Sequence, residues 1–414
     1  MPTLGGLIPP TQLERAVALQ SILSAFATGS FMTGTAVFFT RIVGLSAAQV
    51  GLGLSVSGVV VLGLSVPLGR LSDQIGSRRI WVVAALFEAL LYFAWPSLRG
   101  FGSFALMLSV LAAVETAGRS GRNAYVLEVF PREQRVRSMA FIRAARNIGY
   151  TLGAAAGGFA LAIGTRTAIE SVPVITGALL LINALMVVRL PRIDAPEPMS
   201  TEGLPSPTGL KNKGFVALGV CNGILSTHQV LLNVVVPLWL VERTDAPHVL
   251  LAWLFGTNTV MAVLLTVRTA QGAETIDGAL RATQRGAACM VASCGIIAVT
   301  HDTVGWVSIV LIWLGHVTIT GAELWQSAAG WGLLAELSDP SRLGEYQGVW
   351  NLGYQVESIV GPALFTYLAI NVGNLGWVAI ALLIIGAAVA TRPATRAAER
   401  HLAEHVTPEF VGTR

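Results

Sequence analysis

Charged residues are scarce in this sequence. Of its 414 residues, 12% are Asp, Glu, Lys or Arg, whereas 53% are hydrophobic and the mean hydropathy is +0.66. A soluble domain carries about 25% charged residues, because much of its surface must face water. The composition therefore excludes a soluble enzyme, a disordered protein and a nucleic-acid-binding module, and it predicts a protein that crosses a membrane several times.

Cysteine is rare as well. The three cysteines, Cys221, Cys289 and Cys294, lie in apolar runs without a CxxC spacing, which argues against a disulfide framework or a zinc site and is typical of small buried side chains. The sequence also lacks the GxxxxGK[ST] loop that cradles nucleotide phosphates and the HExxH and GxSxG motifs of hydrolases. We therefore expect no ATP hydrolysis by that loop, no enzymatic activity, no cofactor and no metal ion.

Long apolar runs dominate what is present. A helix needs about 20 mostly apolar residues to cross a bilayer, whereas strands of a membrane barrel alternate polar and apolar residues over about 10 positions. The runs predict an all-α membrane protein with twelve transmembrane helices. They cover residues 16–40, 42–69, 80–98, 101–127, 138–164, 171–188, 214–241, 246–267, 286–300, 303–335 and 344–391, the last divided in two at residues 371–374.

The basic residues predict the orientation. With both termini in the cytoplasm, 19 of the 27 Lys and Arg residues fall in cytoplasmic segments and only 4 outside. Because cytoplasmic loops carry the excess of Lys and Arg, this asymmetry favours an even number of spans and two cytoplasmic termini. Residues 1–13 contain no Lys or Arg, so we interpret the first run as an uncleaved span and not as a signal peptide.

One long polar interval divides the chain into two halves. It is rich in proline, which is typical of a linker, and predicts a six-helix bundle over residues 1–190, a cytoplasmic linker over 191–213, a second bundle over 214–392 and a cytoplasmic tail over 393–414. The sequence Asn-Ile-Gly-Tyr at 147–150 recurs as Asn-Leu-Gly-Tyr at 351–354, an offset of 204 residues. Repeated halves with a binding site between them are a common plan of transporters.

The loop after the second run carries a recognisable motif. Residues 69–79 read GRLSDQIGSRR, which resembles the G-x-L-[AS]-D-x-x-G-x-[RK]-[RK] signature of the major facilitator superfamily at its usual position between spans two and three. The resemblance implies the major facilitator fold and transport by alternating access. It also implies a conformational role for Gly69, Asp73, Gly76, Arg78 and Arg79, and we expect Asp73 to contact Arg78 or Arg79 and neighbouring helix ends.

The fifth run resembles a second motif of that superfamily. Residues 149–158 read GYTLGAAAGG and look like the G-x-x-x-G-P-x-x-G-G end of its antiporter motif, with Ala154 in place of the proline. Gly149, Gly153 and Gly157 recur every four residues, so they form one smooth face for close helix approach. Arg143 and Asn147 lie in a stretch that resembles the drug-efflux branch, the twelve-span multidrug/proton antiporters.

Ionisable residues at membrane depth are costly and indicate function. Glu115, Arg119 and Arg122 share one face of the fourth run, and the resemblance implies that an arginine of this span faces the central cavity; Arg119 matches best and Arg122 is the alternative. Glu323 in the tenth run is our candidate for the main proton carrier, with Glu357 and Glu115 as further candidates for proton coupling.

Other polar and aromatic residues within the runs are weaker candidates. We expect Glu88 to be structural or to lie at the lipid edge. We expect His228 and His316 to be polar core groups with satisfied hydrogen bonds, and the alternative for either is a role in coupling. The remaining candidates for the substrate cavity are Phe31, Trp325, Trp350, Asn222 and Asn233.

The sequence thus predicts a secondary active transporter in the cell membrane, acting as a monomer on a small molecule and protons without nucleic acid. The resemblance favours proton-coupled export of amphipathic organic molecules, as in drug or natural-product efflux and antibiotic resistance. The alternative is a proton-coupled uptake symporter or a facilitator of a small polar nutrient or sugar, which Asn222, Gln229 and Asn233 keep open.

Overall fold

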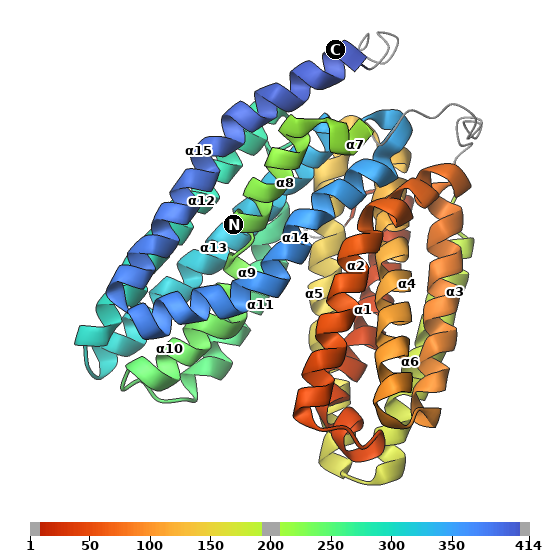
Figure 1. Ribbon diagram of the computed structural model, residues 1–414, viewed down its shortest axis with the longest axis horizontal. Helices are drawn as coiled ribbons and strands as arrows, with labels where there is room; N and C mark the ends of the chain where they lie inside the picture. The colour runs from red at the N-terminus through yellow and green to blue at the C-terminus, as the bar shows by residue number, and fades with distance from the viewer. Residues whose placement is uncertain (1–8, 193–207, 406–414) are drawn as a thin grey trace. The chain divides into compact units, whose positions relative to one another are not determined.

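The computed structural model describes residues 9–192 and 208–405, and this part of the chain contains helices and no strand (Figure 1). Ten of its helical segments are long and apolar enough to cross a membrane. Each predicted run coincides with a helical segment. The helices of two predicted runs, α5 and α14, are not among these ten. Twelve spans and two cytoplasmic termini therefore stay predictions.

The first six runs form helices with short connections. The segments are α1 (Gln12–Val37) with its π-helical continuation η2 (Phe38–Ile42), α2 (Ala47–Ile75), α3 (Ser77–Ala94) with the 3₁₀ turn η3 (Trp95–Ser97), α4 (Gly100–Val129), α5 (Arg132–Ile163) and α6 (Arg166–Val188). The first half of the loop signature is therefore helical, because α2 continues to Ile75 and the chain turns only at Gly76, whose φ of +98° suits glycine.

The second half is less regular. It comprises α7 (Thr208–Lys211), α8 (Lys213–Leu225), α9 (His228–Val230), η4 (Leu231–Val235), α10 (Val236–Arg243), α11 (Leu250–Ala270), α12 (Ile276–Val299), η5 (Thr300–Asp302), α13 (Trp306–Leu337), η6 (Pro340–Arg342), α14 (Leu343–Thr366), η7 (Tyr367–Val372) and α15 (Asn374–His405). The last run breaks at Gly373, with φ of +71°, inside the predicted interval 371–374. α15 continues past the predicted tail boundary at 393.

Polar side chains fix several helix starts. Thr11 accepts a hydrogen bond from the backbone of Glu14, whose carboxylate accepts one from the backbone of Thr11, and Ser46 and Gln49 repeat this capping box at α2. Such caps satisfy backbone N–H groups that have no partner inside the helix. The sequence therefore encodes these boundaries locally.

The helices group into two compact units. The first comprises Met1–Pro131, Ser138–Leu204 and Ser341–Gly348, and the second comprises Arg132–Arg137, Pro205–Pro340 and Val349–Arg414. Each unit thus includes a short segment from the other half of the chain. The expected division of the chain at 190 and 214 stays a prediction, and linker residues 193–207 lie outside the described residues.

The first unit packs α2 and α3 against α4, and α1 and α3 against α6. Its core is aromatic: the ring centroids of Phe31 and Trp95 are 5.6 Å apart, and those of Phe39 and Phe104 are 4.7 Å apart. Such ring pairs add to the stabilisation from apolar burial.

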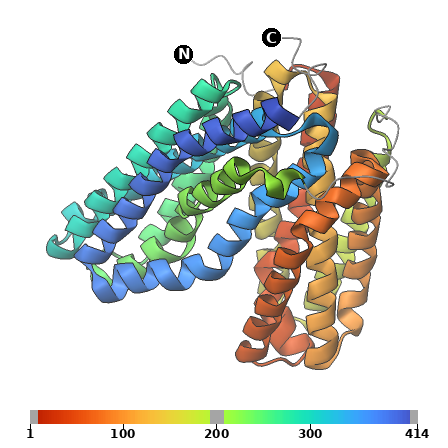
Figure 2. The same cartoon turned by 45° about the horizontal axis from the view of Figure 1, so that its top comes forward.

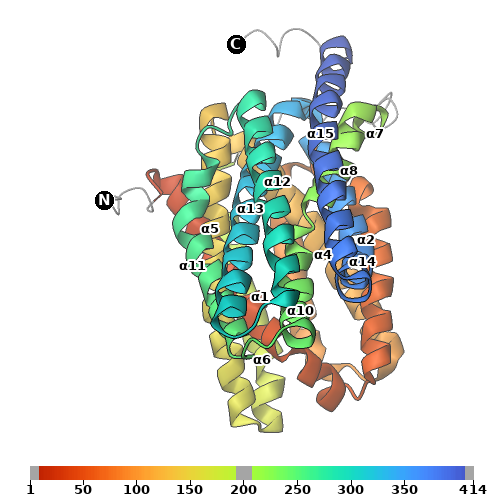
Figure 3. The same cartoon turned by 90° about the vertical axis from the view of Figure 1, so that its left-hand side faces the viewer.

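The second unit packs α12 against α13 and α15, with α8 along α15 and α11 along α13. Figure 2 shows α8 in green beside α15 in dark blue, and Figure 3 shows α12 beside α13. The rings of Trp239 and Trp377, both nearly fully buried, meet edge to face at 5.5 Å. This packing brings α9, η4, α11 and α13 to the site described next.

Candidate functional site

The helix of the seventh run is interrupted. α8 ends at Leu225, and the hydroxyl groups of Ser226 and Thr227 donate hydrogen bonds to the carbonyl oxygens of Asn222, at 2.7 Å, and Ile224, at 2.5 Å. The imidazole Nδ1 of His228 donates to the Leu225 carbonyl at 3.0 Å. Side chains thus occupy carbonyl groups at the end of the helix, which bends or breaks it.

Beyond the break, the chain forms the short α9 and then the π-helical segment η4. π-helical turns within helices are frequent at functional sites, and discontinuous helices build the binding sites of many transporters. Here the irregular segment presents two side-chain amides together: Asn233 Nδ2 donates to the backbone carbonyl of Gln229 at 2.8 Å and lies 3.5 Å from the Gln229 Oε1.

The Gln229 amide reaches the carboxylate of Glu323 on α13. Its Nε2 donates to Glu323 Oε1 at 3.2 Å, and Asn258 Nδ2, from α11, donates to Glu323 Oε2 at 2.8 Å. Asn258 Nδ2 also lies 3.2 Å from Thr320 Oγ1, one turn away on α13. Each carboxylate oxygen therefore has an amide donor from a different helix, although only 7% of Glu323 is exposed.

These residues line a cavity of about 210 Å³ in the second unit. One part of the lining is polar and the other is apolar, and no Lys or Arg belongs to it. The polar residues are Gln229, Asn233, Asn258, His316 and Glu323, and the apolar residues are Leu232, Pro237, Leu251, Leu254 and Phe255. An apolar wall with a few convergent polar groups is typical of a small-molecule site.

His316 differs from the expectation of a satisfied core histidine. It is 4% exposed and lines the cavity, and neither ring nitrogen makes a hydrogen bond. A buried polar atom without a partner costs free energy, about 1–3 kcal/mol. Such atoms in native proteins often mark a place for water, an ion or a reacting group.

Asn222 does not line this cavity. Its Oδ1 accepts a hydrogen bond from Gln326 Nε2 at 3.1 Å, while its Nδ2 and the Gln326 Oε1 are buried without a partner. The pair therefore leaves one donor and one acceptor unpaired, and these are the two groups that one buried water can bond.

The other candidates of the second half lie apart from the cavity. The Trp325 ring faces α12, where the Arg285 guanidinium carbon is 4.8 Å from its centroid, and Trp350 packs at 5.7 Å against Phe215. Glu357 has a buried Oε1 without a hydrogen bond. Of the proposed coupling and cavity residues in this half, Glu323 and Asn233 belong to the cavity.

The first unit holds a separate group of charges. Glu88 on α3 lies within electrostatic range of Glu115, Arg119 and Arg122 on α4 and of Arg146 on α5. These charged neighbours favour the structural alternative for Glu88 over a place at the lipid edge.

The arginines of this group differ in burial and in their contacts. Arg119 is exposed, and the ion pairs of the described residues do not join it to Glu115, although the two share a helix face. Arg122 is half-buried and its Nε has no hydrogen-bond partner. Arg146 donates to the Tyr150 hydroxyl at 2.6 Å and lies over its ring.

The loop signature contacts the start of α14. Residues 341–348, which include this start, belong to the first unit. The Asp73 carboxylate accepts hydrogen bonds from the backbone N–H groups of Gly344, at 2.6 Å, and Glu345, at 2.8 Å. A carboxylate at a helix start satisfies orphan N–H groups and favours the helix dipole. A Cβ on Gly69 would lie 2.1 Å from the Gly344 carbonyl oxygen, so this glycine permits the approach.

The arginines of the signature make other contacts than expected. Arg78 donates to the backbone carbonyl groups of Val188 and Leu190 at the end of α6, and Arg79 is exposed. The expected contact of Asp73 with either arginine is therefore replaced by the backbone of α14. Arg143 and Asn147 on α5 are half-buried.

The glycine face of α5 packs on the backbone of α1. A Cβ on Gly149, Gly153 or Gly157 would lie 2.2–2.4 Å from the carbonyl oxygens of Ile22, Phe26 and Ser30, respectively. The second unit has an equivalent crossing, since a Cβ on Gly353 of α14 would lie 2.0 Å from the Gly219 carbonyl oxygen of α8. Gly149 and Gly353 are the matched residues of the repeat, so both halves use it for close helix contact.

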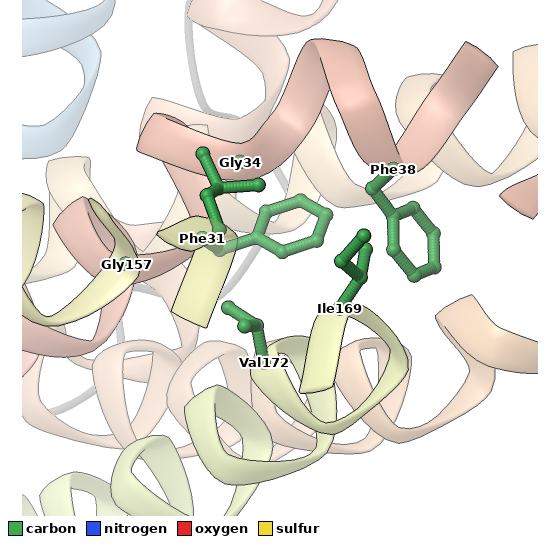
Figure 4. A pocket seen from close by; sticks show the side chains of 7 residues that line it. Phe31, Gly34, Phe38, Gly157, Ile169 and Val172 are labelled. Atoms are coloured by element: carbon green, nitrogen blue, oxygen red, sulfur yellow. The ribbon is translucent and has the colours of Figure 1, made fainter. Parts of the chain in front are cut away.

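Phe31 lies in a different environment from Glu323. It is 5% exposed within the aromatic core, and the space beside it, shown in Figure 4, is about 10 Å³. Phe38, Ile169 and Val172 line the same space. A volume of this size holds about one water, so this packing favours a core role for Phe31.

Sequence reasoning did not identify Asn258. The available signal was its amide, because Asn258 is the only Asn or Gln in the predicted span over residues 246–267. Gln229 was noted only in favour of the uptake alternative. The structure brings both amides to the one carboxylate that the sequence ranked highest.

Residues 17–330 match the family model of the Major Facilitator Superfamily. The chain belongs to this superfamily. Solved structures share its fold. One is the human organic anion transporter MFSD10 (TETRAN), which is 16% identical, with 93% of this chain and 100% of that chain covered and a TM-score of 0.70. Another is the transporter FucP in the outward conformation, which is 14% identical, with 96% of this chain and 99% of that chain covered and a TM-score of 0.70.

A third similar structure is the proton:xylose symporter XylE bound to 6-bromo-6-deoxy-D-glucose, at 14% identity, with 91% of this chain and 94% of that chain covered and a TM-score of 0.68. Comparison with curated proteins finds no match. The family membership makes this multi-pass membrane protein a transporter and not an enzyme. At these identities the solved structures show the fold alone.

Proposed function

We propose that this protein is a secondary active transporter that exports amphipathic small organic molecules in exchange for protons, as a monomer in the cell membrane. The observation that carries the proposal is the carboxylate of Glu323 in a cavity that is half apolar and holds no Lys or Arg. An apolar wall favours the hydrophobic part of a cargo, and the carboxylate favours a cationic or polar group.

Glu323 exchanges a proton for the cargo in this mechanism. When the carboxylate is ionised, the Gln229 and Asn258 amides hold its two oxygens in place, and it binds the polar group of the cargo. Protonation removes the charge and releases the cargo. Alternating access links these two events through one site, because each conformation opens the site to one side of the membrane. A proton moving down 100 mV supplies about 2.3 kcal/mol.

The decisive experiment uses the purified protein in liposomes with an imposed pH gradient and ethidium as a fluorescent organic cation. Wild type is expected to concentrate ethidium in the compartment from which protons leave. Glu323→Gln mimics the protonated carboxyl group and is expected to abolish uphill transport while downhill exchange remains.

Glu170→Gln is the matched control, because Glu170 forms an exposed ion pair with Arg166 at 2.9 Å and lies on α6, outside the cavity. Uphill transport that survives in Glu323→Gln contradicts this assignment of the proton site. Glu357→Gln, measured in parallel, then tests the second buried carboxylate.

A second candidate function is proton-coupled uptake, or facilitated passage, of a small polar nutrient or sugar. The observation that favours it is the set of three amides, Gln229, Asn233 and Asn258, since amides hydrogen-bond hydroxyl groups in both directions. The same liposomes distinguish the two functions: uptake predicts that radiolabelled xylose or fucose moves together with protons and that ethidium does not respond to the gradient.

A further inference from the structure

The cavity contains a second titratable group that the proposed mechanism does not use. His316 lies seven residues before Glu323 on α13, and both line the cavity. At 100° and 1.5 Å per residue, seven residues make about two turns, so the two side chains share one face about 10 Å apart along the helix.

The environment of His316 favours an exchangeable proton over a structural hydrogen bond. Both ring nitrogens are buried and neither makes a hydrogen bond of normal geometry, although the Leu254 backbone lies close to the ring. His228, by contrast, uses its Nδ1 to hold the carbonyl of Leu225 at the helix break. Because the cavity of about 210 Å³ has room for several waters, water can carry protons between the imidazole and the carboxylate.

No other charged group competes for this role in the lining. The residues that α11, η4 and α10 contribute are apolar or amides, and α9 contributes Gln229. On the far side of α13, α12 carries Ser293, whose hydroxyl donates to the Gly315 carbonyl at 2.9 Å, and the buried thiol of Cys294. α8, η5 and α15, which also contact α13, contribute no residue to the lining.

We infer that His316 is a second proton-binding residue of the cavity, so that two protons are exchanged for each monovalent organic cation. This inference rests on the proposed function of Glu323. One proton from water adds to the Glu323 carboxylate and one to a ring nitrogen of His316, and both return to water on the other side. The pair carries a charge of −1 without protons, 0 with one and +1 with two, so it attracts a cation in the first state and repels it in the last.

The stoichiometry is directly measurable with ethidium in the same liposomes. With a gradient of one pH unit and no membrane potential, an exchange of two protons reaches a concentration ratio of about 100, whereas an exchange of one reaches about 10. Two-proton exchange also moves one net charge per cycle, so an imposed potential changes the ratio, whereas one-proton exchange does not respond. Wild type is expected to show the ratio near 100 and the response to potential.

His316→Gln is expected to lower the ratio about tenfold and to abolish the response to potential, while transport driven by the pH gradient remains. His248→Gln is the matched control, because His248 is exposed, and it should behave as wild type. Glu323→Gln removes coupling in the proposed function. Loss of coupling in Glu323→Gln with an unchanged ratio in His316→Gln therefore overturns this inference alone, whereas a coupled Glu323→Gln protein overturns the proposed function.

A measurement without cargo keeps the inference testable if a variant folds poorly or ethidium is not transported. In protein with isotope-labelled histidine, the His316 resonance, assigned by its loss in His316→Gln, is expected to move between its neutral and protonated positions as the pH is lowered from about 9 to about 3. Its midpoint is expected to change in Glu323→Gln, because the two groups share one cavity. A His316 signal that stays constant over this range, or an electroneutral wild type, refutes the two-proton exchange.

Discussion

Replacing Gly157 by alanine tests the contact between α5 and α1. The added Cβ would lie 2.2 Å from the backbone oxygen of Ser30 and 3.2 Å from the Thr33 Cβ. Carbon and oxygen atoms approach to about 3.3 Å, so the two helices must separate by about 1 Å. Such overpacking costs about 1–3 kcal/mol. Alanine also raises helix propensity by about 1 kcal/mol, so the net loss of stability is about 0–2 kcal/mol.

The next residue provides the control for propensity. A Cβ on Gly158 would meet no atom within 4 Å, so Gly158→Ala is expected to gain up to about 1 kcal/mol of stability. The difference between the two variants then isolates the helix contact at about 1–3 kcal/mol. Thermal unfolding in the same detergent measures it. If Gly157→Ala is as stable as Gly158→Ala, the close approach of α5 to α1 is wrong.

Two further variants test polar contacts. Asp73→Asn keeps the size of the side chain but turns one of its two acceptors into a donor that faces the N–H groups of Gly344 and Glu345. We therefore expect the free energy of unfolding to fall by about 1–3 kcal/mol and the inserted protein to transport more slowly. Wild-type transport rates and stability would contradict this role. Asn258→Ala removes the donor at 2.8 Å from Glu323. It is expected to weaken coupled transport in the wild-type background and to have little further effect in a Glu323→Gln background. Additive effects in this double-mutant cycle would mean that the two side chains act independently.

Much of the fold could be predicted from the sequence, because the length and apolarity of a run are local properties. The break of the last run at Gly373 and the turn at Gly76 follow from residues that tolerate positive φ. The spacing of Gly149, Gly153 and Gly157 also predicted a face for close approach, since residues four apart share a helix face. It did not identify α1 as the helix that lies against this face.

The interruption of the seventh run was harder to predict from the sequence. Ser226, Thr227 and His228 can all occupy backbone carbonyl groups, but each also occurs within regular helices. Apolar composition predicted one continuous span over residues 214–241. The break is nevertheless what presents Gln229 and Asn233 to the cavity.

The sequence by itself determined the membrane helices, their order and the presence of a costly carboxylate at Glu323, because burial in lipid constrains composition within each run. Only the tertiary structure decided what surrounds that carboxylate. Gln229 and Asn258 lie 94 and 65 residues before Glu323 in the sequence, on other helices. The packing around His316 leaves its ring nitrogens without the hydrogen bonds that were expected. The partners of a buried polar group depend on which helix faces pack together. This packing is decided by side chains from the whole unit, and not by the single run that carries the group.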